Sequence, residues 1–123
     1  MRQFDGSLSI PVTQVVAREP RVGRLPQVLK ALADPTRLRI VGYLAQRELC
    51  VCDLEDLLGI SQSMTSHHVG VLRRAGLLLQ RREERDIRWV YYRLNPEAVE
   101  SLKDQFNGLL DLSGFDSAPA RCD

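Results

Sequence analysis

The sequence has no long hydrophobic run, and it has few cysteines. No stretch approaches the roughly 20 apolar residues that cross a bilayer. The N-terminal MRQFDGSLSIPVTQ lacks the continuous apolar segment of about 7–15 residues that a secretory signal needs. The three cysteines are an odd number, which argues against a disulfide framework. We therefore expect a cytoplasmic protein whose thiols stay reduced and serve metal or redox chemistry.

An overall excess of charge is also missing, because the 123 residues carry a formal net charge of only +1. The charges are distributed unevenly, however. Residues 60–95 contain seven arginines and three acidic residues, a net charge of +4, whereas residues 96–123 contain two basic and six acidic residues, a net charge of −4. A local cationic block in a nearly neutral chain indicates a surface for a polyanion. The alternative is that these arginines only cover a solvated face.

Helical periodicity dominates residues 25–76. Apolar residues at i, i+3, i+4 and i+7 predict a first helix, along which lie Leu25, Val28, Leu29 and Leu32. Asp34-Pro35 is a typical helix start. The helix that it opens has an apolar side made of Leu38, Val41 and Leu44, with Ile40 close by. A short helix at about 53–58 and a longer one with apolar Met64, Val69 and Leu72 follow. They are joined by Gly59, Ile60 and Ser61, a joint that sets two helices at about 90–120°.

After residue 76 the hydrophobic pattern no longer has a helical period. Residues 77–80 and 89–94 favour β-structure and flank the charged RREERDIR, which predicts a two-stranded hairpin. Asn95-Pro96 begins a last helix, whose apolar stripe contains Val99, Leu102, Phe106 and Leu109. This order predicts a mainly α winged helix-turn-helix domain over residues 25–112. Residues 1–24 are expected to form an N-terminal arm or loose helix, and residues 113–123 a flexible tail.

The helix after Ser61 has polar side chains without a carboxylate in its first half, where a helix in the major groove meets base edges. The residues expected to face DNA are Gln62, Ser63, Thr65, Ser66 and His67, with Arg73 at the helix end. Neighbouring helical positions diverge by about 100°, so we expect one of His67 and His68 to face DNA and the other to pack inward. In the hairpin, Arg81, Arg82, Arg85 and Arg88 are expected to reach phosphates, and their pairing with Glu83, Glu84 and Asp86 indicates that only some of them do. Such contacts give affinity rather than sequence choice. The alternative is that the polar residues of the helix after Ser61 form an ordinary solvated surface that does not bind DNA.

The stretches ALADPTRLRIVGYL, ELCVCDL and SQSMTSHHVGVLRRAGLL, with the hairpin strand ending in VYYRL, resemble the ArsR/SmtB family of metalloregulatory repressors over about residues 25–110. The resemblance implies a homodimeric repressor of double-stranded operator DNA that releases the operator when a metal or metalloid binds. It also implies that the first and last helical stripes form the dimer interface. ELCVCDL resembles the arsenic-sensing motif of the family, so trivalent arsenic (arsenite, antimonite or a methylated arsenical) is the expected inducer, without an organic cofactor.

Cys50 and Cys52 are the expected ligands, because soft thiolates select thiophilic ions. Residues two apart point to the same side only in extended chain, so the pair requires a non-helical segment. The arsenic-sensing motif of the family is Cys-x-Cys-x-x-Cys, and Glu55 stands here at the third position. Four alternatives remain: a third thiolate from Cys122, a methylated arsenical that needs only two thiolates, Glu55 with a zinc ion, and a site that binds no metal. The zinc site that some relatives build on the last helix is not expected, because that helix contains no histidine.

Two functions of other kinds remain open. One is a redox- or persulfide-responsive repressor of the same fold, in which Cys50 or Cys52 is oxidised and has a lowered thiol pKa. The other is a thiol enzyme that uses Cys-Val-Cys as an exchange centre. No motif for such an enzyme surrounds the pair, so we do not expect catalysis.

Overall fold

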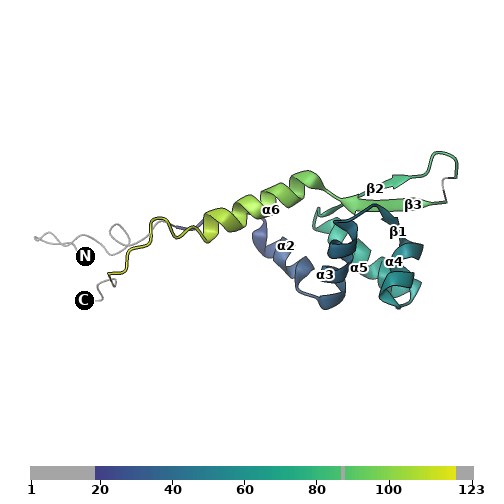
Figure 1. Cartoon of the computed structure of the whole chain (residues 1–123), viewed down its shortest axis with the longest axis horizontal. Helices are drawn as coiled ribbons and strands as arrows, with labels where there is room; N and C mark the ends of the chain where they lie inside the picture. Colours follow the sequence, from purple (N-terminus) through teal and green to yellow (C-terminus); the bar gives the residue numbers. More distant parts are fainter. Residues whose placement is uncertain (1–18, 87, 119–123) are drawn as a thin grey trace, which may run out of the picture.

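The computed structural model describes residues 19–86 and 88–118. Within them the chain forms five helices and a three-stranded sheet (Figure 1). Their bounds, in chain order, are α2 Leu25–Leu32, α3 Pro35–Leu44, β1 Leu49–Cys50, α4 Val51–Leu58, α5 Gln62–Arg74, β2 Leu78–Arg82, β3 Val90–Leu94 and α6 Pro96–Leu109. Most of the expected N-terminal arm lies outside the described residues. Residues 113–118 of the expected tail are exposed and contain no helix or strand.

The helix starts expected at Asp34 and Ser61 are confirmed, and each has a side-chain cap. Asp34 accepts a hydrogen bond from the backbone N–H of Arg37 at 3.0 Å, and Ser61 accepts one from Met64 at 3.2 Å. Such caps satisfy backbone donors that have no partner inside the helix. Gly59 ends α4 with φ of 68°, a conformation that glycine adopts without steric cost. The short joint up to Ser61 then places α5 against α4, which completes the helix-turn-helix.

The hairpin is confirmed, but the sheet has one strand more than expected. Its order is β1–β3–β2, and both pairings are antiparallel. In β1, Leu49 pairs with Tyr92 and Cys50 pairs with Tyr91. The additional strand β1 was not predicted, because its two residues are too few to show an alternating pattern. The hairpin β2–β3 extends away from the helices in Figure 1, and β1 connects its base to the start of α4.

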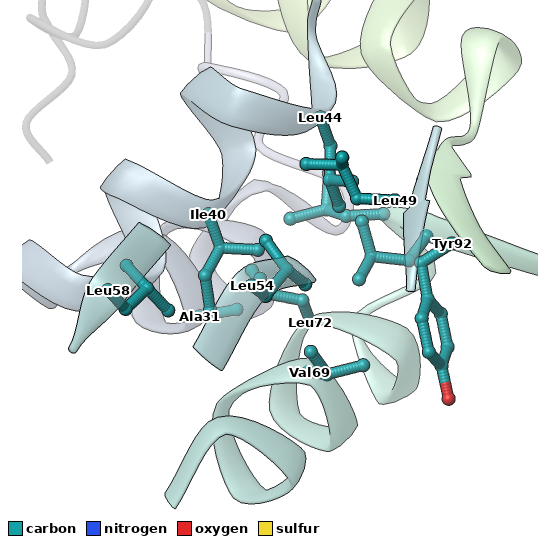
Figure 2. Packing of buried hydrophobic residues seen from close by; sticks show 11 residues of the cluster. Ala31, Ile40, Leu44, Leu49, Leu54, Leu58, Val69, Leu72 and Tyr92 are labelled. Carbon is teal, nitrogen blue, oxygen red and sulfur yellow. The ribbon is translucent and has the colours of Figure 1, made fainter. Parts of the chain in front are cut away.

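The core lies where α3, α4 and α5 meet the base of the sheet (Figure 2). The buried cluster contains Ala31, Ile40, Leu44, Leu49, Leu54, Leu58, Val69, Leu72, Leu77, Leu78 and Tyr92. Ile40 and Leu44 are the residues of α3 that reach it, whereas Leu38 is 55% exposed. The apolar side expected for this helix was therefore partly wrong.

Replacing Leu72 with alanine is expected to destabilise the fold by about 3 kcal/mol, because a fully buried leucine leaves a cavity when it is truncated. Leu72 has no exposed surface and packs at the centre of the cluster. Leu112→Ala is the matched control, since that side chain is 75% exposed and should change stability by less than about 0.5 kcal/mol. Urea unfolding at a fixed protein concentration measures both values. Equal losses in the two variants would contradict the assignment of Leu72 to the core.

Helices α2 and α6 carry the two stripes that were expected at a dimer interface, and they pack against each other. Most of these side chains keep accessible surface in the single chain: Leu29 and Leu109 are exposed, and Val28, Leu32, Val99, Leu102 and Phe106 are half-buried. Leu25 is different, because only 2% of it is exposed. Leu25 packs inside its own chain and offers almost no surface to a partner, which corrects its expected interface role.

Candidate nucleic-acid interface and thiol site

The first half of α5 presents a polar, uncharged surface. Gln62, Ser63, Ser66 and His67 are all exposed, as expected for side chains that face a ligand. The helix contains no carboxylate along its 13 residues, and Arg73 and Arg74 lie exposed in its last turn. The cationic side chains at this end favour the negative end of the helix dipole. The surface thus combines hydrogen-bonding groups with positive charge.

Thr65 does not belong to this surface. It is fully buried, and its hydroxyl donates a hydrogen bond to the Ser61 carbonyl at 2.8 Å. Thr65, His68, Val69 and Leu72 follow the i, i+3, i+4, i+7 spacing of one helix face, and that face packs inward. Met64 lies beside this face and is 48% exposed. The expected DNA-facing role of Thr65 was therefore wrong. Its hydroxyl can be buried because the bond to the Ser61 carbonyl satisfies the donor.

His68 is the histidine that packs inward, and His67 is the exposed one, as expected from their spacing. Arg37 of α3 donates from Nη1 to His68 Nδ1 at 3.1 Å and from Nε to the Ala31 carbonyl at 2.6 Å. Because a guanidinium only donates, Nδ1 must accept and the ring proton lies on Nε2. The backbone N–H of Arg37 holds the pKa of the Asp34 carboxyl below its ordinary value. This network connects α5 to α2 and α3.

The arginines of the hairpin differ in their partners. Arg88 forms two hydrogen bonds to Asp86, at 2.7 and 2.9 Å, and these lower the pKa of the Asp86 carboxyl. Arg82 and Arg85 are exposed near the tip. The charge of Arg88 is already matched by a carboxylate.

Arg81 was also expected to reach a phosphate, but it lies near the end of β2 and is bound by a carboxylate of its own chain. Its guanidinium binds the Glu48 carboxylate at 2.7–3.0 Å and lies 4.8 Å from the centre of the Tyr91 ring. Glu48 precedes β1, and Tyr91 pairs with Cys50 across the sheet. The position of β2 is therefore tied to the segment that contains Cys50. The sequence analysis did not predict the ion pair between Arg81 and Glu48, because the two residues are 33 positions apart.

Cys50 lies at the point where β1 ends and α4 begins, and its thiol caps the helix. Sγ accepts the backbone N–H of Asp53 at 3.4 Å and donates to Asp53 Oδ2 at 3.2 Å. The same carboxylate accepts the backbone N–H of Cys50 at 3.1 Å. This is a capping box in which cysteine takes the usual place of serine or threonine. The spacing Cys-x-x-Asp was the sequence signal for it, and we missed it.

The two cysteines have different surroundings. Cys50 is 5% exposed and has extended backbone, with φ of −88° and ψ of 171°. Burial raises the pKa of its thiol above the ordinary value. Cys52 lies in the first turn of α4 and is exposed. The expected non-helical segment therefore includes Cys50 but not Cys52, and Cys122 lies outside the described residues.

A third metal ligand does not accompany the pair in the described part of the chain. No group of three His, Cys, Asp or Glu side chains within residues 19–86 and 88–118 is arranged to hold a metal ion. Glu55, the alternative ligand, is half-buried on α4. Two thiols are therefore the donor set that the described residues provide.

Known proteins resemble this chain along most of these elements. The sequence model described as "Bacterial regulatory protein, arsR family" matches residues 34–78, from the start of α3 into β2. The Arsenic resistance transcriptional regulator ArsR1 of Pseudomonas putida is 44% identical over 87 residues, which are 70% of this chain and 66% of that protein. The Transcriptional repressor SmtB homolog of Synechocystis is 39% identical over 76% of this chain and 73% of its own length. The chain belongs to the arsR family.

The solved structures agree with this membership in the arsR family. A homodimeric winged helix-turn-helix DNA-binding domain from Mycobacterium bovis, described as a possible ArsR-family regulator, is 31% identical with a TM-score of 0.58. The match covers 72% of this chain and 80% of that domain. The winged helix-turn-helix fold is thereby confirmed. The alignment with the Pseudomonas regulator leaves about a third of that protein unmatched. No helix in the described residues is long and apolar enough to cross a membrane.

Proposed function

We propose that this protein is a transcriptional repressor that binds operator DNA as a homodimer and releases it when trivalent arsenic binds to cysteine thiolates. The observation that carries the proposal is the position of Cys50, which belongs to β1 and also caps the first helix of the helix-turn-helix. A ligand at this sulfur acts directly on the element that positions α5. The names of the Pseudomonas and Synechocystis relatives support a regulator of this kind.

Operator reading is assigned to the exposed first half of α5. Gln62, Ser63, Ser66 and His67 offer donors and acceptors to base edges in the major groove. Arg73, Arg82 and Arg85 contribute contacts to phosphates, which position the protein without reading sequence. In a two-fold dimer, the two α5 helices meet successive major grooves about 34 Å apart. The accessible apolar side chains of α2 and α6, such as Leu29, Phe106 and Leu109, supply the surface for such a dimer.

The donor set favours a thiophilic ligand, because sulfur ligands select soft ions. Cys50 and Cys52 supply two thiolates, and inorganic arsenite forms pyramidal complexes with three. The third thiolate is assigned to Cys122 of the same chain or of the partner subunit. A methylated arsenical requires only the two thiolates of the Cys-Val-Cys pair. Zinc at Cys50, Cys52 and Glu55 is disfavoured, since these residues do not form a metal-holding group in the structure.

We attribute release of the operator to the hydrogen bonds that Cys50 loses when it binds a ligand. To bind a soft ion its thiol loses the proton that it donates to Asp53, and the sulfur turns away from the Asp53 backbone N–H. Loss of an N-cap costs about 1 kcal/mol, so two subunits lose about 2 kcal/mol. That is roughly a 30-fold change in affinity if all of it is expressed in DNA binding. Cys50 also pairs with Tyr91, so the same movement reaches the hairpin.

Operator release followed by fluorescence anisotropy tests the proposal. Arsenite, methylated arsenite, zinc and peroxide are titrated separately against the reduced protein on labelled operator DNA. Release by an arsenical, with zinc and peroxide inactive, is the expected result. Release by peroxide alone would replace arsenic sensing by a redox switch at Cys50 and Cys52, and release by zinc alone would indicate a metal-ion sensor.

Replacing Cys122 with serine is expected to weaken the response to inorganic arsenite by at least about tenfold, while leaving the response to methylated arsenite unchanged. Loss of one of three ligands reduces affinity for inorganic arsenite, whereas the methylated form uses only two sulfurs; changes around metal sites often cost about 10–100-fold. The same anisotropy titration gives both potencies. If the ratio of the two potencies is the same in wild type and variant, Cys122 is not a ligand.

A further inference from the structure

A groove between α2 and the second half of α5 is not used by the proposed function. Its volume is about 310 Å³. Three cationic side chains line it: Arg24 at the N-cap of α2, Lys30 from α2 and Arg74 from α5. The amide of Gln27 and the apolar side chains of Ala31 and Val71 complete the lining. The two helices pack against each other.

The charge of this groove has one sign. No acidic residue lines it. The side chains of Arg24, Lys30 and Arg74 take part in no ion pair within residues 19–86 and 88–118. Arg81 and Arg88 in the hairpin differ, because each is bound to a carboxylate. Three unpaired cations around one hollow make an electrostatic site for an anion.

The position of Arg74 is favoured by a glycine. The guanidinium folds back over α5, and a Cβ atom added at Gly70 would lie 3.1 Å from Nη1 and 3.8 Å from Cζ. Arg74 therefore occupies space that a larger residue would fill, and this keeps its charge beside the groove. The end of α5 carries a partial negative charge of about half a unit, which three full positive charges outweigh.

We propose that this groove binds a phosphate group. Guanidinium groups bind phosphate oxygens with two parallel hydrogen bonds, and Lys30 adds a compact charge. The phosphate has two possible sources. A helix of 13 residues is about 20 Å long, whereas the major groove is about 12 Å wide. The far end of α5 therefore reaches the DNA backbone when its first half reads bases. A free phosphate in solution offers the same chemistry. The DNA source rests on the proposed function, and the free source does not.

Two single variants that each remove one charge, Lys30→Gln and Arg74→Gln, test the groove together with the double variant that carries both changes. Lys103→Gln is the matched control, because Lys103 is exposed on α6 and does not line the groove. The first measurement is operator affinity as a function of salt concentration. Each lost phosphate contact lowers the slope of log K against log salt by about 1, so a dimer should lose about 2 per substitution, while the control keeps the wild-type slope. Unchanged melting temperatures exclude unfolding.

The second measurement titrates inorganic phosphate into DNA-free protein and follows backbone amide signals by NMR. Saturable shifts at Gly70 and Val71 that disappear in the double variant would assign the groove to free phosphate. A reduced salt slope without such shifts would assign it to the DNA backbone. An unchanged slope together with no saturable shifts would overturn the proposal. If the wild-type protein does not bind DNA at all, the proposed function fails, and the phosphate titration still decides on the groove.

Discussion

Replacing Cys50 and Cys52 together with serine is expected to leave operator binding nearly unchanged and to abolish release by arsenite. A serine hydroxyl at position 50 accepts the Asp53 N–H and donates to the Asp53 carboxylate, so the cap of α4 survives. Cys52 is exposed and the change there is small, so operator affinity should stay within about threefold of wild type. Hydroxyl groups do not replace thiolates as ligands of soft ions. Anisotropy on labelled operator, with and without arsenite, measures both properties.

Single alanine variants separate ligand binding from capping. Cys50→Ala removes the thiol and the cap, so operator affinity should fall by up to about 30-fold even without arsenic, for two caps at about 1 kcal/mol each. Cys52→Ala is the matched control, because Cys52 has an exposed side chain and does not cap α4. It should bind DNA normally and fail to respond. If Cys50→Ala binds operator as tightly as Cys52→Ala, the cap is not connected to DNA binding. Loss of DNA binding in the double serine variant would mean that the pair is structural.

The helices of this fold could be predicted because their signals are local. Asp34 and Ser61 cap helices through bonds to residues three positions later, and Gly59 ends one by its own backbone conformation. The strand β1 could not be predicted in this way. Its two residues are a strand only because Leu49 and Cys50 meet Tyr92 and Tyr91, about 40 positions later, and such pairing leaves no pattern in a short segment.

Errors within the helices arose from ranking residues by hydrophobicity alone. Thr65 was expected on the DNA-facing surface, but the structure buries it, whereas the more apolar Met64 is 48% exposed. The hydroxyl of Thr65 is satisfied by the Ser61 carbonyl one turn earlier, so the small side chain can be buried. In α3, Leu38 was preferred over Ile40, yet Ile40 and Leu44 form the i, i+4 pair that reaches the core.

The candidate sites could be predicted from composition and spacing, but the burial and hydrogen bonds of their residues could not. The polar first half of α5 and the Cys-Val-Cys pair are visible in the sequence. The burial of Cys50 depends on packing around β1, and its partnership with Asp53 requires the helix to begin at Val51. The groove between α2 and α5 depends on residues 50 positions apart, Arg24 and Arg74, so only the fold brings it together.

Replacing Ser66 with glutamate is expected to reduce operator affinity by at least about 100-fold without changing stability. Ser66 is exposed on the first half of α5, and this helix contains no carboxylate in the natural sequence. If α5 reads DNA as proposed, the substitution removes a hydrogen-bonding group from the reading surface and places a negative charge between phosphates. A lost contact at a base costs about 1–3 kcal/mol in each subunit, which over two subunits is about 30-fold or more before repulsion is added. Anisotropy gives the affinity, and thermal melting monitors the fold.

Two further variants show whether charge or position causes the effect. Ser66→Ala removes the hydroxyl without adding charge and should cost about 1 kcal/mol per subunit, the value of an ordinary hydrogen bond. Ser113→Glu adds the same charge to the exposed segment that follows α6 and should bind operator like wild type apart from a small salt-dependent loss. If Ser66→Glu and Ser113→Glu bind equally well, α5 does not lie in the major groove. The affinity for random DNA separates the two effects. If Ser66→Glu weakens binding to operator and random DNA equally, the glutamate acts on the phosphates. If Ser66→Ala weakens binding to the operator alone, the serine reads a base.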